Sequence, residues 1–362
     1  MTTPAEAREV LLREGLRPPA TLTLAITGAC NLACRHCWVG AGTAAAAGHV
    51  PGQTLHRLMR EFADLGGEGI RITGGEPLSH PGWQELLRLA RTLGFRAITL
   101  QTNAMLLRHD HVATLAEVDF PGLSIQVSLD GVRASTHDLV RGAGAFEGTV
   151  AGIQLLVEAG FGRRLTILFT EMRHNLAEFP ELLAFAADRG IAAVVSGTLV
   201  RGGRAAEGGE IAPPDPRQYE QLFRRYDTEA GFRKLYGDRG TMAALEWRAN
   251  TSDRTECCTF AENPYLTPDG LLYPCLLCHA DEYAVTGVFD KGLAAALAEG
   301  APLWSSLLQV SRSRGESLAE CRECPGRSAC AGGCMGRAQG SCGDLMAADD
   351  RCGVRRSIYC RK

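Results

Sequence analysis

The sequence predicts an α/β fold, a partial (β/α)6 TIM-like barrel followed by a cysteine-rich C-terminal domain. Three observations predict it. Strand-like and helix-like patterns alternate strictly through residues 21–230. Polar or glycine-rich turns follow several of the predicted strands at their carboxyl ends. Nine of the 14 cysteines lie beyond residue 270, and none lies between residues 38 and 256, so two regions of the chain have different composition.

The strand and helix patterns form six pairs. Six short apolar segments have the length of strands: 21–27, 69–73, 96–102, 123–129, 165–170 and 191–199. Six segments with apolar residues every three or four positions have the pattern of helices: 53–65, 83–93, 105–117, 149–159, 176–189 and 216–228. This alternation implies a parallel sheet with right-handed crossovers, and six units are too few for a closed eight-stranded barrel.

Length and composition indicate a globular enzyme of about two domains. The predicted division is an extension at 1–20, the barrel at 21–230, a bridge at 231–256 and the cysteine-rich domain at 257–362. A net charge of −3 argues against nucleic acid as a partner. The N-terminal residues are charged and helix-prone, unlike a signal peptide or a membrane helix, so a cytoplasmic protein without a membrane partner is expected.

Three cysteines follow the first predicted strand with the spacing Cys30-x3-Cys34-x2-Cys37. In a reducing cytoplasm, thiols at such short spacings indicate metal rather than disulfides. Three thiolates can cap three irons of a cubane cluster and leave the fourth iron open to a substrate or cosubstrate. The alternative is a zinc site, but zinc usually takes four ligands or a histidine-rich set, and His36 has no evident second ligand pair nearby.

The second predicted strand leads into Thr73-Gly74-Gly75-Glu76-Pro77. Paired glycines allow a close backbone approach, and Glu76 would place a carboxylate beside exposed amides, a combination that suits a zwitterionic ligand. The alternative is an ordinary turn between a strand and a helix.

The next two strands end in polar side chains on the same predicted rim. These are Asn103 after the third strand, and Ser128 and Asp130 after the fourth. Each taken alone is as compatible with a turn or a helix cap as with a binding site. Their coincidence with the cysteine loop favours a site at this rim.

The cysteine motif together with Gly74-Gly75-Glu76-Pro77 on the next strand resembles the radical S-adenosylmethionine (SAM) enzymes over about residues 21–230. The resemblance implies that the three cysteines hold a 4Fe–4S cluster whose open iron binds SAM. It also implies a methionyl-binding role for the glycine-rich turn, adenine contacts for His36 or Trp38, and ribose or carboxylate contacts for Ser128 and Asp130. The loop at residues 202–205 resembles one that often helps to bind this cosubstrate.

A second group of cysteines lies in the C-terminal region. Cys257 and Cys258 precede a Pro-Asp-Gly hairpin signal that leads to Cys275, and four more follow with the spacing Cys321-x2-Cys324-x5-Cys330-x3-Cys334 before Cys352. A zinc knuckle is one alternative. With the N-terminal motif, however, the pattern resembles the SPASM domain of many radical SAM enzymes.

The SPASM resemblance implies two auxiliary 4Fe–4S clusters, and therefore three clusters in all. Cys321, Cys324, Cys330 and Cys352 would hold one, and Cys258 or Cys257 with Cys275 and Cys334 would hold the other. The fourth ligand of the latter stays open between the second cysteine of the 257/258 pair, Cys278 and no protein ligand. Cys278, Cys342 and Cys360 have no assigned role.

By this resemblance the chain cleaves SAM to a 5′-deoxyadenosyl radical that abstracts hydrogen from an unactivated C–H bond. The expected reaction is oxidation or crosslinking of a peptide or protein side chain, with a flavodoxin- or ferredoxin-type reductant. Because only about twenty residues precede the first strand, a leader-binding domain would be a separate chain. Leu276 stands where the formylglycine-forming branch has an aspartate, which disfavours that reaction.

Two alternatives remain from the sequence. One is a radical SAM dehydrogenase, epimerase or decarboxylase that acts on a small molecule in cofactor or antibiotic biosynthesis. The other is a zinc-binding interaction module without enzymatic activity.

Overall fold

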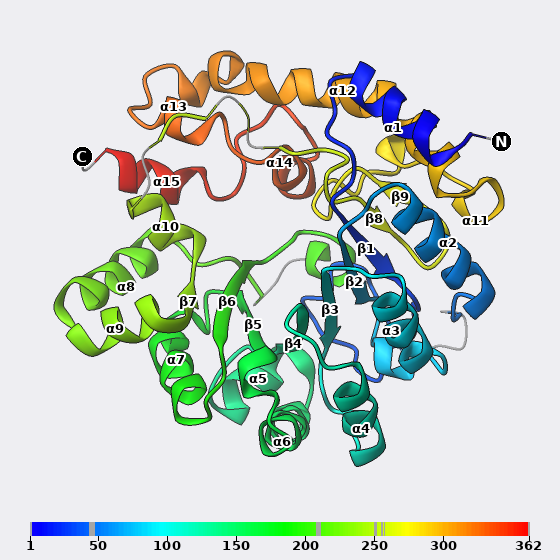
Figure 1. The fold of residues 1–362 in the computed structure, drawn as a ribbon. Coiled ribbons are helices and arrows are strands. Elements are labelled where there is room, and N and C mark those ends of the chain that lie inside the picture. Colours follow the sequence, from blue (N-terminus) through cyan, green and yellow to red (C-terminus); the bar gives the residue numbers. More distant parts are fainter. Residues whose placement is uncertain are drawn as a thin grey trace.

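The computed structural model describes residues 2–42, 48–207, 211–249, 252–254, 256 and 258–360, and its described strands form one nine-stranded sheet (Figure 1). Six parallel strands make up most of the sheet: β1 (Thr21–Ala25), β2 (Gly69–Thr73), β3 (Ala97–Thr102), β4 (Leu123–Ser128), β5 (Leu165–Glu171) and β6 (Ala193–Thr198). Each pairs with its neighbours in the sequence, as right-handed β–α–β crossovers require. The predicted partial barrel is therefore confirmed.

Short strands extend both ends of this sheet. The two-residue strand β7 (Gly240–Thr241) pairs in parallel with β6. At the other end, β8 (Tyr265–Leu266) lies parallel to β1, and β9 (Leu272–Tyr273) returns antiparallel to β8. The Pro-Asp-Gly segment thus forms a hairpin, as expected, and this hairpin attaches the cysteine-rich region directly to the first barrel strand. Since the strand order ends at β7 and β9, the barrel is open.

Helices surround the outside of the curved sheet in Figure 1. Six correspond to the predicted ones: α2 (Gly52–Asp64), α3 (Trp83–Thr92), α4 (His109–Val118), α6 (Ala145–Glu158), α7 (Phe179–Asp188) and α8 (Pro216–Thr228). Helix α5 (Ala134–Arg141), between β4 and α6, was not predicted. The predicted bridge contains α9 (Ala230–Arg239) and α10 (Ala243–Ala249).

The two faces of the sheet differ in chemistry. Alternate residues of β2, β3 and β4 are buried aliphatic side chains that face the helices: Ile70, Ile72, Ile98, Leu100, Ile125 and Val127. The residues between them face the inside of the barrel, because successive side chains of a strand point to opposite faces. Those that line the interior include Thr23, Arg71, Gln101, Ser128 and Thr170. The apolar core therefore lies between the sheet and the helices, and these polar strand side chains face the interior of the barrel.

The C-terminal region is mainly helical. It contains α11 (Val288–Lys291), α12 (Leu293–Ser317), α13 (Arg327–Cys330), α14 (Met335–Cys342) and α15 (Cys352–Tyr359). Helix α12 has 25 residues and continues through Pro302. The N-terminal helix α1 (Pro4–Arg13) packs along α12 (Figure 1).

Buried polar contacts connect this region to the barrel. Arg351 forms a 2.7 Å ion pair with Glu171 at the end of β5, and both side chains are almost fully buried. Arg337 donates to the carbonyl of Leu199 just after β6 (3.2 Å) and pairs with Asp350. Breaking such a buried pair is costly, so the cysteine-rich region is fixed on the barrel rim. No helix in the described ranges is long and apolar enough to cross a membrane.

Candidate functional site

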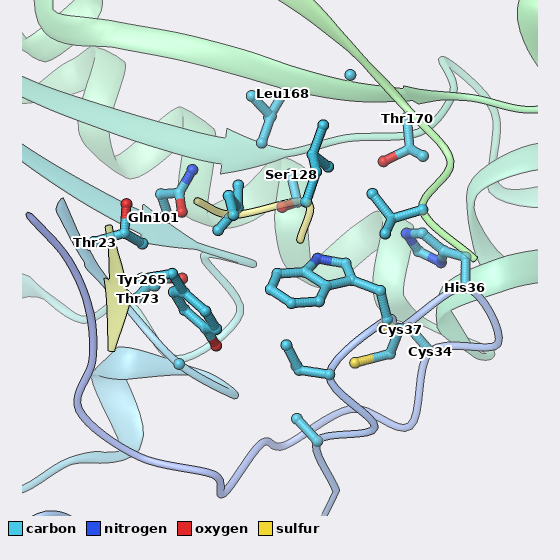
Figure 2. Close-up of a pocket in the computed structure, with 18 of the residues that line it drawn as sticks. Thr23, Cys34, His36, Cys37, Thr73, Gln101, Ser128, Leu168, Thr170 and Tyr265 are labelled. Carbon is cyan, nitrogen blue, oxygen red and sulfur yellow. The ribbon is translucent and has the colours of Figure 1, made fainter. Parts of the chain in front are cut away.

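A single cavity of about 610 Å³ opens inside the barrel, and the cysteine loop forms one of its walls (Figure 2). Cys30, Cys34 and Cys37 all line it. Burial raises the pKa of the Cys30 thiol to about 12, and that of Cys34 is also raised. Cys34 is buried, and Cys30 and Cys37 are half-buried beside it. Three neighbouring thiols on one loop are a donor set that fits iron in a cluster.

The glycine-rich turn after β2 packs against the backbone of the cysteine loop. The Gly75 amide donates to the Thr27 carbonyl (2.7 Å), and the Glu76 amide donates to the Ala29 carbonyl (2.8 Å). A Cβ at Gly74 would lie 2.4 Å from the Thr27 oxygen, and one at Gly75 would lie 2.1 Å from the Ala29 oxygen. The expectation of exposed amides is therefore wrong for Gly75 and Glu76, whose amides already bond the neighbouring loop.

Glu76 is fully buried and satisfied by the protein itself. Its carboxylate accepts hydrogen bonds from Thr102 Oγ1 (2.7 Å), the Asn103 amide (2.8 Å) and the Leu78 amide (3.0 Å). Burial nevertheless raises its pKa to about 7, although these donors oppose the rise. Asn103 continues the connection by donating to Asn31 in the cysteine loop (2.8 Å). Glu76 thus ties β2, β3 and the cysteine loop together at the cavity wall.

Asp130 lies behind the cavity wall rather than in it. Its buried carboxylate accepts from Arg141 Nε (2.7 Å) and from the Thr170 amide (2.8 Å), and lies 3.2 Å from His36 Nε2. Burial alone would raise its pKa, but Arg141 and His36 hold that pKa well below its usual range. We therefore correct the expectation of a direct ligand contact, because Asp130 positions two side chains that do line the cavity, His36 and Arg141.

Arg141 lines the cavity and is not among the residues predicted from the sequence. It is the last residue of α5 and is only 9% exposed. Its positive charge lowers the pKa of Cys34 against the effect of burial. The helical pattern of α5 is weak in the sequence, because α5 lacks a regular apolar stripe and its buried face includes Thr136 and His137.

The remaining expected contacts lie around the same cavity. Ser128 and Trp38 both line it. Trp38 packs against the rings of Tyr265 (centroids 5.5 Å apart) and His279 (4.4 Å), which come from the cysteine-rich region. Burial lowers the pKa of His279 to about 4, so this ring is neutral at pH 7.

The loop after β6 closes over the cysteine loop. The Arg204 amide donates to the Cys37 carbonyl (3.0 Å), and Arg204 Nε donates to the Cys34 carbonyl (2.8 Å). A Cβ at Gly203, where φ is +47°, would lie 2.7 Å from the Cys37 oxygen. This loop therefore fixes the backbone of the second and third cysteines.

The C-terminal thiols gather in two places. The first auxiliary group consists of Cys258, Cys275, Cys278 and Cys334. Three of its members line the main cavity, and Cys278 is fully buried beside them. Burial and the neighbouring thiols raise the pKa of Cys258 and of Cys278 to about 12 each. Cys257 lies outside the described residues, so its place relative to this group is open.

The second auxiliary group surrounds a separate small cavity. It consists of Cys321, Cys324, Cys330 and Cys352, and all four line that cavity with Leu318 and Tyr359. Cys342 and Cys360 are exposed and line neither cavity. Within the described part of the chain, no three His, Cys, Asp or Glu side chains converge on a site for one metal ion.

This chain is similar in sequence to several known proteins. Residues 24–186 match the model of the radical SAM superfamily. The mycofactocin maturase MftC of Mycobacterium ulcerans is 29% identical over 350 residues, which cover 92% of this chain and 88% of that protein. An AdoMet-dependent heme synthase of Methanosarcina barkeri is 34% identical over 206 residues, 57% of each chain.

Two solved structures share the fold. Streptococcus suis SuiB bound to SAM has a TM-score of 0.69 at 17% identity and covers 96% of this chain and 80% of its own. Native anSMEcpe with bound AdoMet has a TM-score of 0.72 at 17% identity, and the match covers 94% of this chain and 96% of anSMEcpe. Residues 24–186 thus form a radical SAM domain, and the cysteine-rich C-terminal region fits the fold of these SPASM-type structures. Enzymes of this family use a 4Fe–4S cluster.

Proposed function

We propose that the chain is a maturase-type oxidoreductase that modifies a side chain of a peptide or protein. The observation that carries the proposal is that one cavity is lined both by Cys30, Cys34 and Cys37 and by thiols of the first auxiliary group. A substrate in this cavity would have a radical-generating centre on one side and an electron acceptor on the other. This arrangement suits an oxidation, which must remove an electron after the hydrogen atom has been abstracted.

The first cluster would be held by Cys30, Cys34 and Cys37. When bound and reduced, it supplies the electron that cleaves SAM into methionine and the 5′-deoxyadenosyl radical. The chain holds this loop through backbone bonds from Gly75, Glu76 and Arg204. Its conformation is therefore set by the protein before any cofactor binds.

SAM would be oriented by groups on two sides of the cavity. The Gly75 and Glu76 amides already bond the cysteine loop, so the carbonyl oxygens of this turn would accept hydrogen bonds from the methionyl ammonium group. Arg141 and Ser128 would face the methionyl carboxylate, since a guanidinium is suited to this anion. His36, held by Asp130, and Trp38 provide rings for the adenine.

The other two clusters would be held by the auxiliary groups. For the first auxiliary group we propose Cys278 as the fourth ligand, supported by its full burial beside Cys258, Cys275 and Cys334. Four thiolates would leave that cluster without an open iron, which favours electron transfer over substrate binding as its role. The second auxiliary group, with its own four thiols, would continue the path toward a flavodoxin- or ferredoxin-type partner.

The peptide assignment draws on the relatives. MftC is named as a maturase, and one SuiB structure is described as bound to its precursor peptide SuiA. A separate leader-binding protein, a cytoplasmic location and the domain boundaries at residues 20, 230 and 256 remain predictions. The heme synthase relative favours the alternative of a small-molecule substrate.

The test is a comparison of substrates with the anaerobically reconstituted protein. A precursor peptide encoded beside the gene and a tetrapyrrole carboxylate are each incubated with SAM and reductant. We expect the peptide to increase 5′-deoxyadenosine formation and to lose two hydrogen atoms by mass spectrometry. A modified tetrapyrrole together with an unchanged peptide would replace this proposal with the small-molecule alternative.

A further inference from the structure

Most of the strand side chains that face the barrel interior carry no charge. The side chains that line the cavity from β1 to β5 are mostly hydroxyl and amide groups: Thr23, Thr73, Gln101, Thr102, Ser128 and Thr170. Figure 2 shows several of them pointing into one space. Leu168 of β5 is apolar, and Arg71, at the middle of β2, is the permanently charged side chain of this set. An interior of this kind must offer that charge a partner or carry the cost of burying it.

The described residues provide no such partner. Arg71 makes no ion pair with them, and its Nε is buried without a hydrogen bond. Its neighbours across the sheet are Thr23 on β1 and Thr99 on β3, which are both uncharged. Burial lowers the pKa of Arg71, and no nearby carboxylate opposes this effect.

The other two arginines of the cavity differ in this respect. Arg141 is paired with Asp130, and Arg204 donates to the carbonyls of Cys34 and Gly40. Both side chains therefore make stabilising contacts in the folded protein without any ligand. Arg71 contributes no such bond, so its charge is costly to the free protein.

The position of Arg71 separates it from the groups that would hold SAM. Arg71 precedes Gly74 by three residues on an extended strand, roughly 10 Å deeper in the barrel than the glycine-rich turn. The carboxylate of SAM would be met by Arg141 at the rim. An anion at Arg71 would therefore belong to the second molecule in the cavity, the substrate.

We propose that Arg71 binds a carboxylate of the substrate and so places the reacting C–H bond in the cavity. The inference rests on the proposed function, since it assumes that SAM and the substrate share this cavity. A guanidinium presents a planar pair of donors that matches both oxygens of a carboxylate. The carboxylate can come from a peptide carboxyl terminus, from an acidic side chain or from a small molecule, and the test distinguishes these sources.

The test is equilibrium binding to the holoenzyme with oxidised clusters and saturating SAM, so that SAM is not consumed and its own site is filled. Three pairs of probes differ only in a carboxylate replaced by an amide. They are N-acetyl-phenylalanine and its amide for a peptide terminus, N-acetyl-glutamate α-amide and N-acetyl-glutamine α-amide for a side chain, and 3-phenylpropionate and its amide for a small molecule.

We expect at least one acid to bind about tenfold more tightly than its amide, as a charge-assisted hydrogen-bonded pair provides. Arg71→Gln should remove this preference, and Arg71→Lys should retain part of it. The control Arg96→Gln removes an exposed charge paired with Glu68 and should retain all of it. Equal binding of every acid and amide, or a preference that survives in Arg71→Gln, would overturn the proposal.

A second readout separates ligand binding from a structural role. Because Arg71 makes no hydrogen bond or ion pair with the described residues, Arg71→Gln should raise the melting temperature of the ligand-free holoenzyme by about 2 °C. A fall of that size would show that Arg71 stabilises the fold and would contradict the proposal. Neither readout requires SAM cleavage, so a failure of the proposed function and a failure of this inference can be told apart.

Discussion

Replacing Asp130 with asparagine should lower the free energy of unfolding, because it breaks the buried ion pair with Arg141. Asp130→Asn keeps an oxygen that can accept from the Thr170 amide but turns an amide NH2 group toward Arg141 Nε, now 2.7 Å from the carboxylate. Asp130 is completely buried, and Arg141 is 9% exposed. Breaking such a pair by removing one partner costs about 3–5 kcal/mol, because the other charge stays buried without compensation.

Urea unfolding of the holoenzyme without oxygen measures this loss. Asp130→Asn should lower the free energy of unfolding by about 3 kcal/mol and raise the KM for SAM in the 5′-deoxyadenosine assay, since Arg141 and His36 lose their anchor. The control Asp110→Asn removes the partner of Arg108 in an exposed pair and should leave stability unchanged within error.

The double variant tests the cause. Adding Arg141→Gln to Asp130→Asn removes the uncompensated cation, so part of the lost stability should return while the SAM defect remains. If the two losses simply add, Asp130 does not act through Arg141. If Asp130→Asn is as stable as the native protein, our account of the buried pair is refuted.

Three further predictions concern single residues. Cys278→Ala should lower bound iron by up to about four atoms and change the EPR spectrum of the reduced protein. The control Cys342→Ala should change neither the iron content nor the spectrum. Identical spectra for the native protein and both variants would show that Cys278 is not a cluster ligand. The pKa of Glu76 is raised to about 7 in the folded state, so that state binds the proton more tightly than the unfolded chain. The free energy of unfolding should therefore fall by about 2 kcal/mol between pH 5 and 7, and Glu76→Gln should lack this fall. Equal slopes for the two proteins would show that Glu76 does not titrate there. Gly75→Ala places a Cβ against the cysteine loop, so it should lower the free energy of unfolding by about 1–3 kcal/mol and reduce the amount of bound iron. The control Gly231→Ala adds a Cβ in open space and should change neither quantity. Equal behaviour of the two variants would refute the close packing of the two loops.

The sequence predicted the barrel and the rim that carries the site because both are local patterns. Apolar periodicity marks the six strands, and the cysteine and glycine motifs follow them directly. Helix α5 was missed because it buries Thr136, His137 and Arg141 on its inner face, so polar residues occupy positions where periodicity expects apolar ones. With α5 the source of Arg141 was missed as well.

Other features depend on contacts between distant parts of the chain. Nothing local distinguishes an aspartate that touches a ligand from one that, like Asp130, pairs with residues of other elements. The same holds for Cys278, whose relation to Cys334 is set by the fold.

The central claim is that Cys30, Cys34 and Cys37 hold one of three 4Fe–4S clusters. The most direct test is the iron and sulfide content of the anaerobically reconstituted protein and of a variant with these three cysteines replaced by alanine. We predict about twelve iron and twelve sulfide per native chain, and about eight of each in the variant, which should form no 5′-deoxyadenosine. A native protein that contains zinc without sulfide, or a variant with unchanged iron, would contradict the account.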